Sequence, residues 1–117
     1  METVAHDLQA FKAEFFRALA HPVRIRILEA LVRGERSVQE LQDALALPQP
    51  LVSQQLAVLR AKNVVAARKQ GNVVRYALRD ALVGDLLKVA RQIFNNHLVG
   101  SQGLLKELRQ EHRRRRT

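Results

Sequence analysis

The sequence predicts an α+β fold that is mainly helical, with one two-stranded antiparallel hairpin set among the helices. Two observations predict it. Apolar residues recur at three- and four-residue steps through most of the chain, which is the period of amphipathic helices. Over residues 64–78 this pattern gives way to two runs rich in β-branched residues around Gly71-Asn72, which is typical of a tight hairpin.

Length and charge limit the organisation and the partners of the chain. Its 117 residues have room for one domain, which we expect at 1–112, followed by a basic tail at 113–117. The net charge is +9, from 20 Lys and Arg against 11 Asp and Glu, and the tail supplies only part of it. This balance favours a polyanionic partner, with nucleic acid ahead of an anionic membrane.

Several classes of protein are excluded by what the sequence lacks. It has no cysteine, and therefore no disulfide, cysteine nucleophile or thiolate metal site. It has no apolar run long enough for a bilayer, and its start, METVAHDLQA, lacks the layout of a signal peptide. We therefore expect a cytoplasmic protein that has no membrane partner.

Two helices are expected at the start of the chain. The first spans Asp7–Ala20, with Asp7 as a cap. Its apolar stripe consists of Leu8, Phe11, Phe15 and Leu19. The second begins at Pro22, directly after His21, and runs to about Arg33, where Gly34 ends it.

Two shorter helices follow, joined by a tight Leu-Pro-Gln turn. Ser37 and Glu40 form a capping box for the first of them, which ends before Leu47-Pro48. Its inward residues are expected to be Val38, Leu41 and Leu45. The next helix runs from about Gln49 to Lys62, with an apolar face of Val52, Leu56 and Leu59. Its opposite face carries Pro50, Ser53, Gln54 and Ala57.

The hairpin and a final helix complete the chain. The strands are expected at Val64–Gln70 and Val73–Leu78, with polar residues crowding the tip. The final helix starts at about Asp80 and has a stripe of Leu82, Leu86, Val89 and Ile93. The stripe either continues through Gly100, Leu104 and Leu108 or is broken by the glycines of GSQG at 100–103, since each helical glycine costs about 1 kcal/mol.

The order of these elements is that of a winged helix-turn-helix. Two short helices joined by a tight turn, the second exposing small polar side chains, are what a reader of the DNA major groove requires. A basic hairpin directly after them adds a wing. Each feature alone is also typical of a solvated surface, but their succession favours DNA binding.

Three segments carry a resemblance to a known family: FFRALAHPVRIRILEAL at 15–31, SVQELQDALALPQPLVSQQLAVLRAKNVV at 37–65 and AARKQGNVVRYAL at 66–78. In them the chain resembles the ArsR/SmtB-type winged-helix repressors of bacteria. The resemblance implies that the helix after the Leu-Pro-Gln turn enters the major groove, and that the first and last helices form a homodimer. It makes recognition residues of Gln49, Ser53, Gln54 and Gln55, the last standing where the family often has His.

The chemistry of the side chains gives a candidate DNA-binding set. Gln can pair bidentately with adenine, and Gln54, nearest the centre of the exposed face, ranks first for base readout. Arg68, Lys69 and Arg75 are expected to contact phosphates. The full set is Gln49, Pro50, Ser53, Gln54, Gln55, Arg60, Arg68, Lys69, Gln70, Asn72 and Arg75.

The predicted function is sequence-specific regulation of transcription, by a homodimer that represses from an inverted-repeat operator in double-stranded DNA. Its two recognition helices would reach successive major grooves about 34–36 Å apart. The sequence has no phosphate-binding glycine loop, G-x-S-x-G or HExxH motif, so we expect no catalytic site and no cofactor.

Two alternatives stay open. Metal-responsive members of the family use Asp and His on the last helix, where this chain has Asp85, His97 and His112 without the paired spacing of a ligand set; we predict no metal site. Winged helices also bind proteins, and a protein interface would depend on salt far less than groove binding. The arginines at 113–116 are either a solvated tail or a phosphate contact, and the effector is not predicted.

Overall fold

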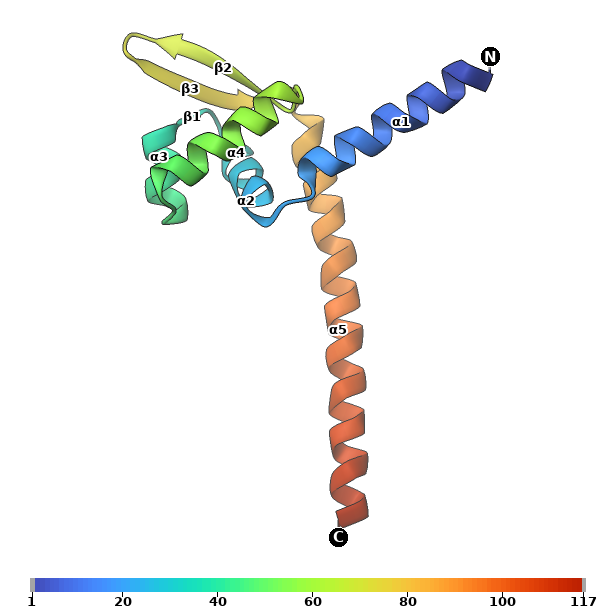
Figure 1. Ribbon diagram of the computed structural model, residues 1–117. Helices are drawn as coiled ribbons and strands as arrows, with labels where there is room; N and C mark the ends of the chain where they lie inside the picture. Colours follow the sequence, from blue (N-terminus) through green and yellow to red (C-terminus); the bar gives the residue numbers. More distant parts are fainter. Residues whose placement is uncertain (1, 117) are drawn as a thin grey trace. The chain divides into compact units, whose positions relative to one another are not determined.

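The computed structural model describes residues 2–116, and gives side chains for 7–97, 103 and 105–114 (Figure 1). The chain divides into two compact units, Met1–Gly84 and Asp85–Thr117. The elements are α1 (Glu2–Leu19), α2 (Pro22–Leu31), β1 (Arg36–Ser37), α3 (Val38–Leu45), α4 (Gln49–Ala61), β2 (Val65–Gln70), β3 (Val73–Leu78) and α5 (Leu82–Arg116). The predicted helices and hairpin are confirmed, with ends shifted by a few residues; α1 begins at Glu2, so Asp7 lies within it and the prediction that Asp7 caps it was wrong.

The core of the first unit lies among α2, α3, α4 and the first residues of β2. Its large side chains are under 2% exposed: Ile27, Leu28, Leu41, Val52, Leu56, Leu59, Val64 and Val65. Burying each stabilises the fold by about 1.5–3 kcal/mol. The predicted apolar face of α4 is entirely within this core, which leaves the other face of the helix to solvent.

Side-chain caps set the starts of α2 and α3. His21 is the N-cap of α2, where its Nδ1 accepts a hydrogen bond from Val23 N at 3.1 Å. At α3 the capping box is complete, because Ser37 Oγ accepts from Glu40 N and Glu40 Oε1 accepts from Ser37 N, both at 3.1 Å. Ala46 then takes the left-handed conformation, with φ 53° and ψ 47°, and turns the chain into α4.

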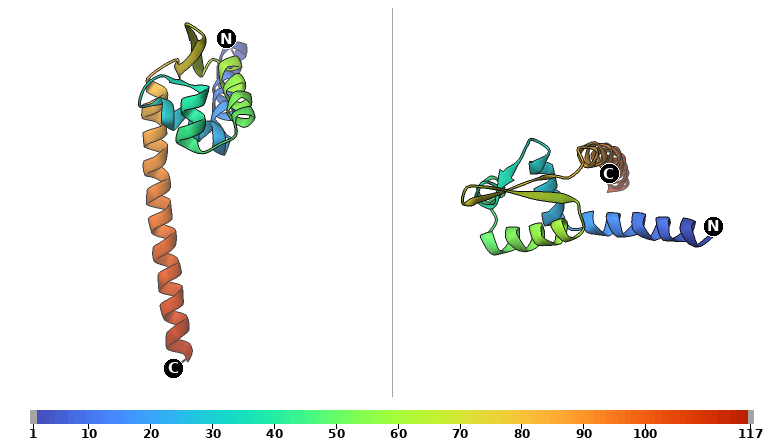
Figure 2. Two further views of the ribbon diagram at one scale, coloured as in Figure 1. Left: turned by 90° about the vertical axis from the view of Figure 1, so that its left-hand side faces the viewer. Right: turned by 90° about the horizontal axis from the view of Figure 1, so that it is seen from above.

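The sheet has three strands in the order β1-β3-β2, all antiparallel. Gly71, at φ +63°, makes the turn of the hairpin, which projects from the helices of this unit (Figures 1 and 2). The strand β1 was not predicted, because two residues show no alternation. It pairs Arg36 with Tyr76 and Ser37 with Arg75, and so joins the root of the wing to the start of α3.

The final helix is continuous through residues 100–103, so the glycines there do not interrupt it. It begins after Asp80, whose Oδ1 accepts a hydrogen bond from Leu82 N at 2.9 Å. Gly84 is buried, and a Cβ added at this position would lie 3.3 Å from the side chain of Val32. This explains why the first turn of α5 has a residue without a side chain here. Within the described residues, no helix combines the length and the apolar character that crossing a membrane requires.

Candidate nucleic-acid interface

The outward face of α4 carries short polar side chains, as predicted. Gln49, Pro50 and Gln54 are exposed and Ser53 is half-buried. Gln49 Nε2 donates to Ser53 Oγ at 2.8 Å, one helical turn away. Arg60 is exposed in the last turn. This face rests on a buried apolar face, so its side chains are presented from a rigid element.

Gln55 lies apart from this exposed face. It is only 8% exposed, and its Oε1 accepts a hydrogen bond from Arg24 Nη1 at 3.2 Å. The second Arg24 nitrogen, Nη2, donates to the carbonyl of Arg17 at 3.2 Å. One residue along a helix is a rotation of about 100°, which turns Gln55 from the exposed face toward α2. Gln55 therefore joins α4 to α2 and, through Arg24, to the end of α1.

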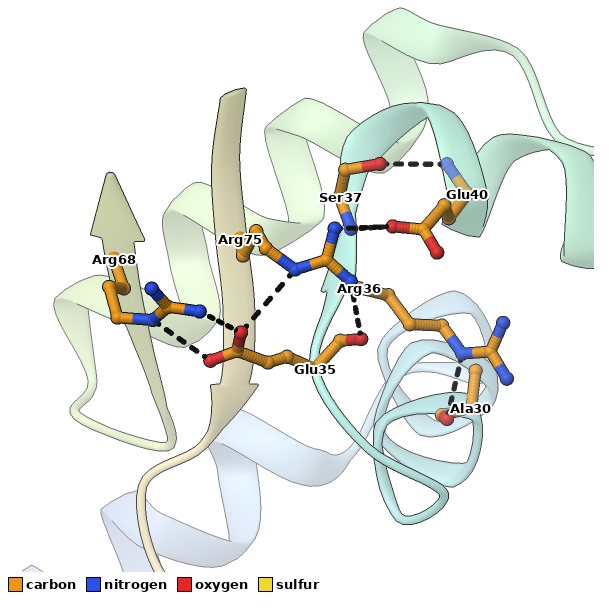
Figure 3. Close-up of polar contacts among 7 residues, drawn as sticks. All are labelled: Ala30, Glu35, Arg36, Ser37, Glu40, Arg68 and Arg75. Carbon is orange, nitrogen blue, oxygen red and sulfur yellow. Dashed lines mark hydrogen bonds and ion pairs between the residues drawn. The ribbon is translucent and has the colours of Figure 1, made fainter. Parts of the chain in front are cut away.

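The tip of the hairpin presents Lys69, Gln70 and Asn72 to solvent. Arg68 lies nearer the root, and its side chain is 56% exposed. Its guanidinium forms an ion pair with the carboxylate of Glu35, donating from Nε to Oε2 at 3.2 Å and from Nη2 to Oε1 (Figure 3). The predicted basic wing is present, but this cation has an internal partner.

Arg75 has a structural environment that differs from the predicted phosphate contact. Its side chain is only 25% exposed and meets three acceptors. Nη2 donates to the Glu35 carbonyl at 3.1 Å, Nε lies 3.3 Å from Glu35 Oε1, and Nη1 lies 2.9 Å from Glu40 Oε1 (Figure 3). Since Glu40 also belongs to the capping box, Arg75 ties β3 to the start of α3. These contacts hold the side chain within the protein, and its predicted phosphate contact stays a prediction.

Hydrogen bonds, with nearby positive charges adding to them, lower the pKa of both carboxyl groups. The hydrogen bond from Arg68 lowers the pKa of Glu35, and the charges of Arg68 and Arg75 act in the same direction. For Glu40, the backbone N–H of Ser37 is the largest cause of a lowered pKa, with Arg75 adding to it. Sequence reasoning missed Glu35, although two arginines facing each other across a hairpin signal the need for an acid.

The residues considered for metal binding are not brought together by one chain. Asp85, His97 and His112 are exposed on α5. At 1.5 Å per residue along the helix axis, Asp85 and His97 are about 18 Å apart, and His97 and His112 about 22 Å. Across the described part of the chain, no group of three or more His, Cys, Asp or Glu is placed to hold a metal ion.

Two helices leave large apolar side chains exposed. On α1 these are Leu8, Phe11 and Phe16, although the same helix buries Ala18 and Leu19 at its end. On α5 they are Leu82, Val89, Ile93, Phe94, Leu105 and Leu108. Apolar surface of this kind is typical of a protein interface.

Comparison with known proteins agrees with this geometry. Residues 21–67, from the cap of α2 into β2, match the model of a family described as bacterial regulatory protein, arsR family. An uncharacterized HTH-type transcriptional regulator of Mycobacterium tuberculosis, Rv0081, is 47% identical over 106 residues, which are 90% of this chain and 93% of that protein. Its crystal structure matches with a TM-score of 0.72 at 48% identity, over 80% of this chain and 94% of that one.

Two further solved structures are similar. The transcriptional repressor BigR from Xylella fastidiosa matches with a TM-score of 0.70 at 33% identity, over 80% of this chain and 96% of its own. The homodimeric winged helix-turn-helix DNA-binding domain of Mb0332 from Mycobacterium bovis matches with a TM-score of 0.72 at 28% identity, over 80% and 87%. The chain belongs to the arsR family of bacterial regulatory proteins and has the winged helix-turn-helix fold of transcriptional regulators.

Proposed function

We propose that this protein is a homodimeric repressor that binds an inverted-repeat operator in duplex DNA and reads its bases with α4. The observation that carries the proposal is the exposed face of α4, where short polar side chains stand on a helix anchored by three fully buried apolar residues, Val52, Leu56 and Leu59. Bacterial DNA lies in the cytoplasm, where we place the action of this protein.

The exposed face of α4 has the chemistry for direct readout. An amide side chain matches the N6 and N7 positions of adenine in the major groove, and a hydroxyl bonds either a base or a phosphate. Gln54 is free of the packing that holds Gln55, and it projects between Pro50 and Ala57, two small side chains that permit close approach. The hydrogen bond from Gln49 to Ser53 pre-orients both groups. We assign base reading to Gln54 first, and then to Gln49 and Ser53.

The wing and the end of α4 supply phosphate contacts. Arg60, Lys69, Gln70 and Asn72 are exposed. The two cations among them suit ionic contacts to phosphates, and the two amides can donate hydrogen bonds to the DNA backbone, irrespective of sequence. Each phosphate that is neutralised adds about 0.9 to the slope of log affinity against log salt. We therefore expect the wing to make DNA binding depend steeply on salt. We expect α4 to make it depend on the base sequence.

Dimerisation is proposed to use α1 and α5. Phe11 is 74% exposed on α1, and α5 carries its own exposed apolar stripe. The similar domain of Mb0332 is a homodimer. Two copies bring two α4 helices to one DNA duplex, which is the requirement for reading an inverted repeat.

Selection of bound duplexes from a random pool tests this function, repeated with zinc, with nickel and with a chelator. We expect an inverted repeat to be enriched, with binding that weakens steeply as salt rises. Enrichment that depends on the metal would favour a metal-responsive repressor. Failure to enrich any sequence would contradict the proposal and favour a protein-binding module.

A further inference from the structure

We propose that Glu35 acts as an internal substitute for a DNA phosphate: its carboxylate holds Arg68 in the free protein and yields this guanidinium to the DNA backbone in the complex. The proposal rests on the DNA binding proposed above and adds its regulation. Glu35 would thus limit how much the wing contributes to affinity.

The two arginines at Glu35 are held very differently. Arg75 is three-quarters buried and meets three acceptors, two on Glu35 in the loop before β1 and one on Glu40 of α3, which fixes it. Arg68 is more than half exposed, and both of its hydrogen bonds end on the Glu35 carboxylate. A guanidinium fork matches a carboxylate and a phosphate in the same bidentate manner. Arg68 is therefore the cation that can exchange one anion for the other.

The exchange leaves no charge without a partner inside the protein. When Arg68 moves to a phosphate, Glu35 keeps Arg75, whose Nε lies 3.3 Å from Oε1 and whose Nη2 holds the Glu35 carbonyl. An exposed ion pair is also weak, since water and salt screen it. The Glu35–Arg68 pair is thus strong enough to orient the free wing and weak enough to be replaced.

The strand register gives Glu35 a second effect, opposite in sign. Arg68 and Arg75 face each other across β2 and β3, and like charges in that position destabilise a sheet. Glu35 lies between them and offsets this repulsion (Figure 3). Removing its charge should therefore lower the stability of the free protein while strengthening its binding to DNA, a combination that a purely structural role does not produce.

The test is the isosteric variant Glu35→Gln, compared with the wild type on an enriched duplex and on a random duplex across a salt series. We expect about two- to fivefold tighter binding to both duplexes at about 0.1 M salt and a lower Tm, with a salt slope close to that of the wild type, because Arg68 contacts a phosphate in both complexes. Glu29→Gln is the matched control, because Glu29 is an exposed residue of α2 and its replacement changes the net charge equally. In an Arg68→Ala background, Glu35→Gln should no longer increase the affinity for either duplex.

Three results separate the outcomes. A gain no larger than that of Glu29→Gln, or one that persists without Arg68, would overturn the role of Glu35 while leaving DNA binding in place. Absence of DNA binding by the wild type would overturn the proposed function itself. NMR of the arginine Nε–H groups in the wild type does not depend on the folding of a variant: the Arg68 signal should shift when duplex is added and the Arg75 signal should not, and the reverse would contradict the proposal.

Discussion

Arg68 and Arg75 carry the same charge and face each other across the hairpin, yet their surroundings give them different roles. Arg68 has one acidic partner and an exposed side chain, whereas Arg75 joins the wing to the capping box of α3. The difference arises from residues 33 to 40 positions away, which amphipathic periodicity cannot report. The charges of the two arginines and their positions in the hairpin were therefore predictable from the sequence, but their different partners were not.

Arg75→Ala should lower the free energy of unfolding by about 1–3 kcal/mol, because it removes charge-assisted hydrogen bonds from a mostly buried guanidinium. Urea denaturation measures this change. Lys69→Ala, at the exposed tip of the same hairpin, is the control and should change stability by less than about 0.5 kcal/mol. Equal stability of the two variants would refute the positioning role of Arg75.

Stability should also depend on the ionisation of Glu40. The pKa of this carboxyl is lowered from 4.5 by the fold, so its stabilisation is present above pH 4.5 and is lost as the pH falls below that value. The wild type should therefore lose stability in acid more steeply than Glu40→Gln does. Denaturation midpoints between about pH 3 and 7 test this difference, and parallel curves would count against it.

At the scale of elements, α4 has two neighbouring glutamines with separate tasks. Helical rotation sends Gln54 to solvent and Gln55 into the packing against α2. The apolar face of this helix was predictable from its period, because Val52, Leu56 and Leu59 recur on one side. A polar residue at the edge of that face is ambiguous until its partner, Arg24, is placed by the fold.

Gln55→Ala should destabilise the fold by about 1–3 kcal/mol, because it removes an acceptor from a guanidinium whose Nε is already buried without a partner among the described residues. The ratio of its affinities for the enriched and random duplexes should stay that of the wild type. Thermal unfolding and binding titrations measure the two effects. A changed ratio of the two affinities with unchanged stability would favour base reading by Gln55.

Elements with long periodic patterns or clear turn and capping signals were predictable, and a strand that exists only through long-range pairing was not. The capping box of α3 and the hairpin turn at Gly71 could be identified from local chemistry. The strand β1 could not, since its two residues become a strand only by pairing with β3. The continuation of α5 past the glycines at 100–103 could not be decided either. The low helix propensity of glycine argues against it, whereas the apolar stripe on both sides of the glycines argues for it.

At the scale of the whole molecule, the proposed function requires a second copy of the chain. The family model matches residues 21–67, from α2 into β2, whereas most of the exposed large apolar side chains lie on α1 and α5. In the proposed function this arrangement separates DNA reading from dimerisation along the sequence. The resemblance led us to expect a dimer, and the exposure of Phe11 offers an apolar side chain for its interface.

Phe11→Lys should weaken the dimer at least about tenfold, because a charge replaces an exposed aromatic side chain in the proposed interface. Sedimentation equilibrium measures the dissociation constant. Gln9→Lys, an equal charge change about 200° away around α1, is the control and should leave the dimer intact. A Phe11→Lys protein that remains dimeric would contradict the role of α1.

The most direct test of the central claim, that α4 reads DNA bases, is the ratio of affinities for an enriched duplex and a random duplex, measured for the wild type and Gln54→Ala at one salt concentration. We predict that Gln54→Ala loses about 1–3 kcal/mol of binding to the enriched duplex and keeps its affinity for random DNA and its stability. An equal loss on both duplexes would contradict base reading by α4.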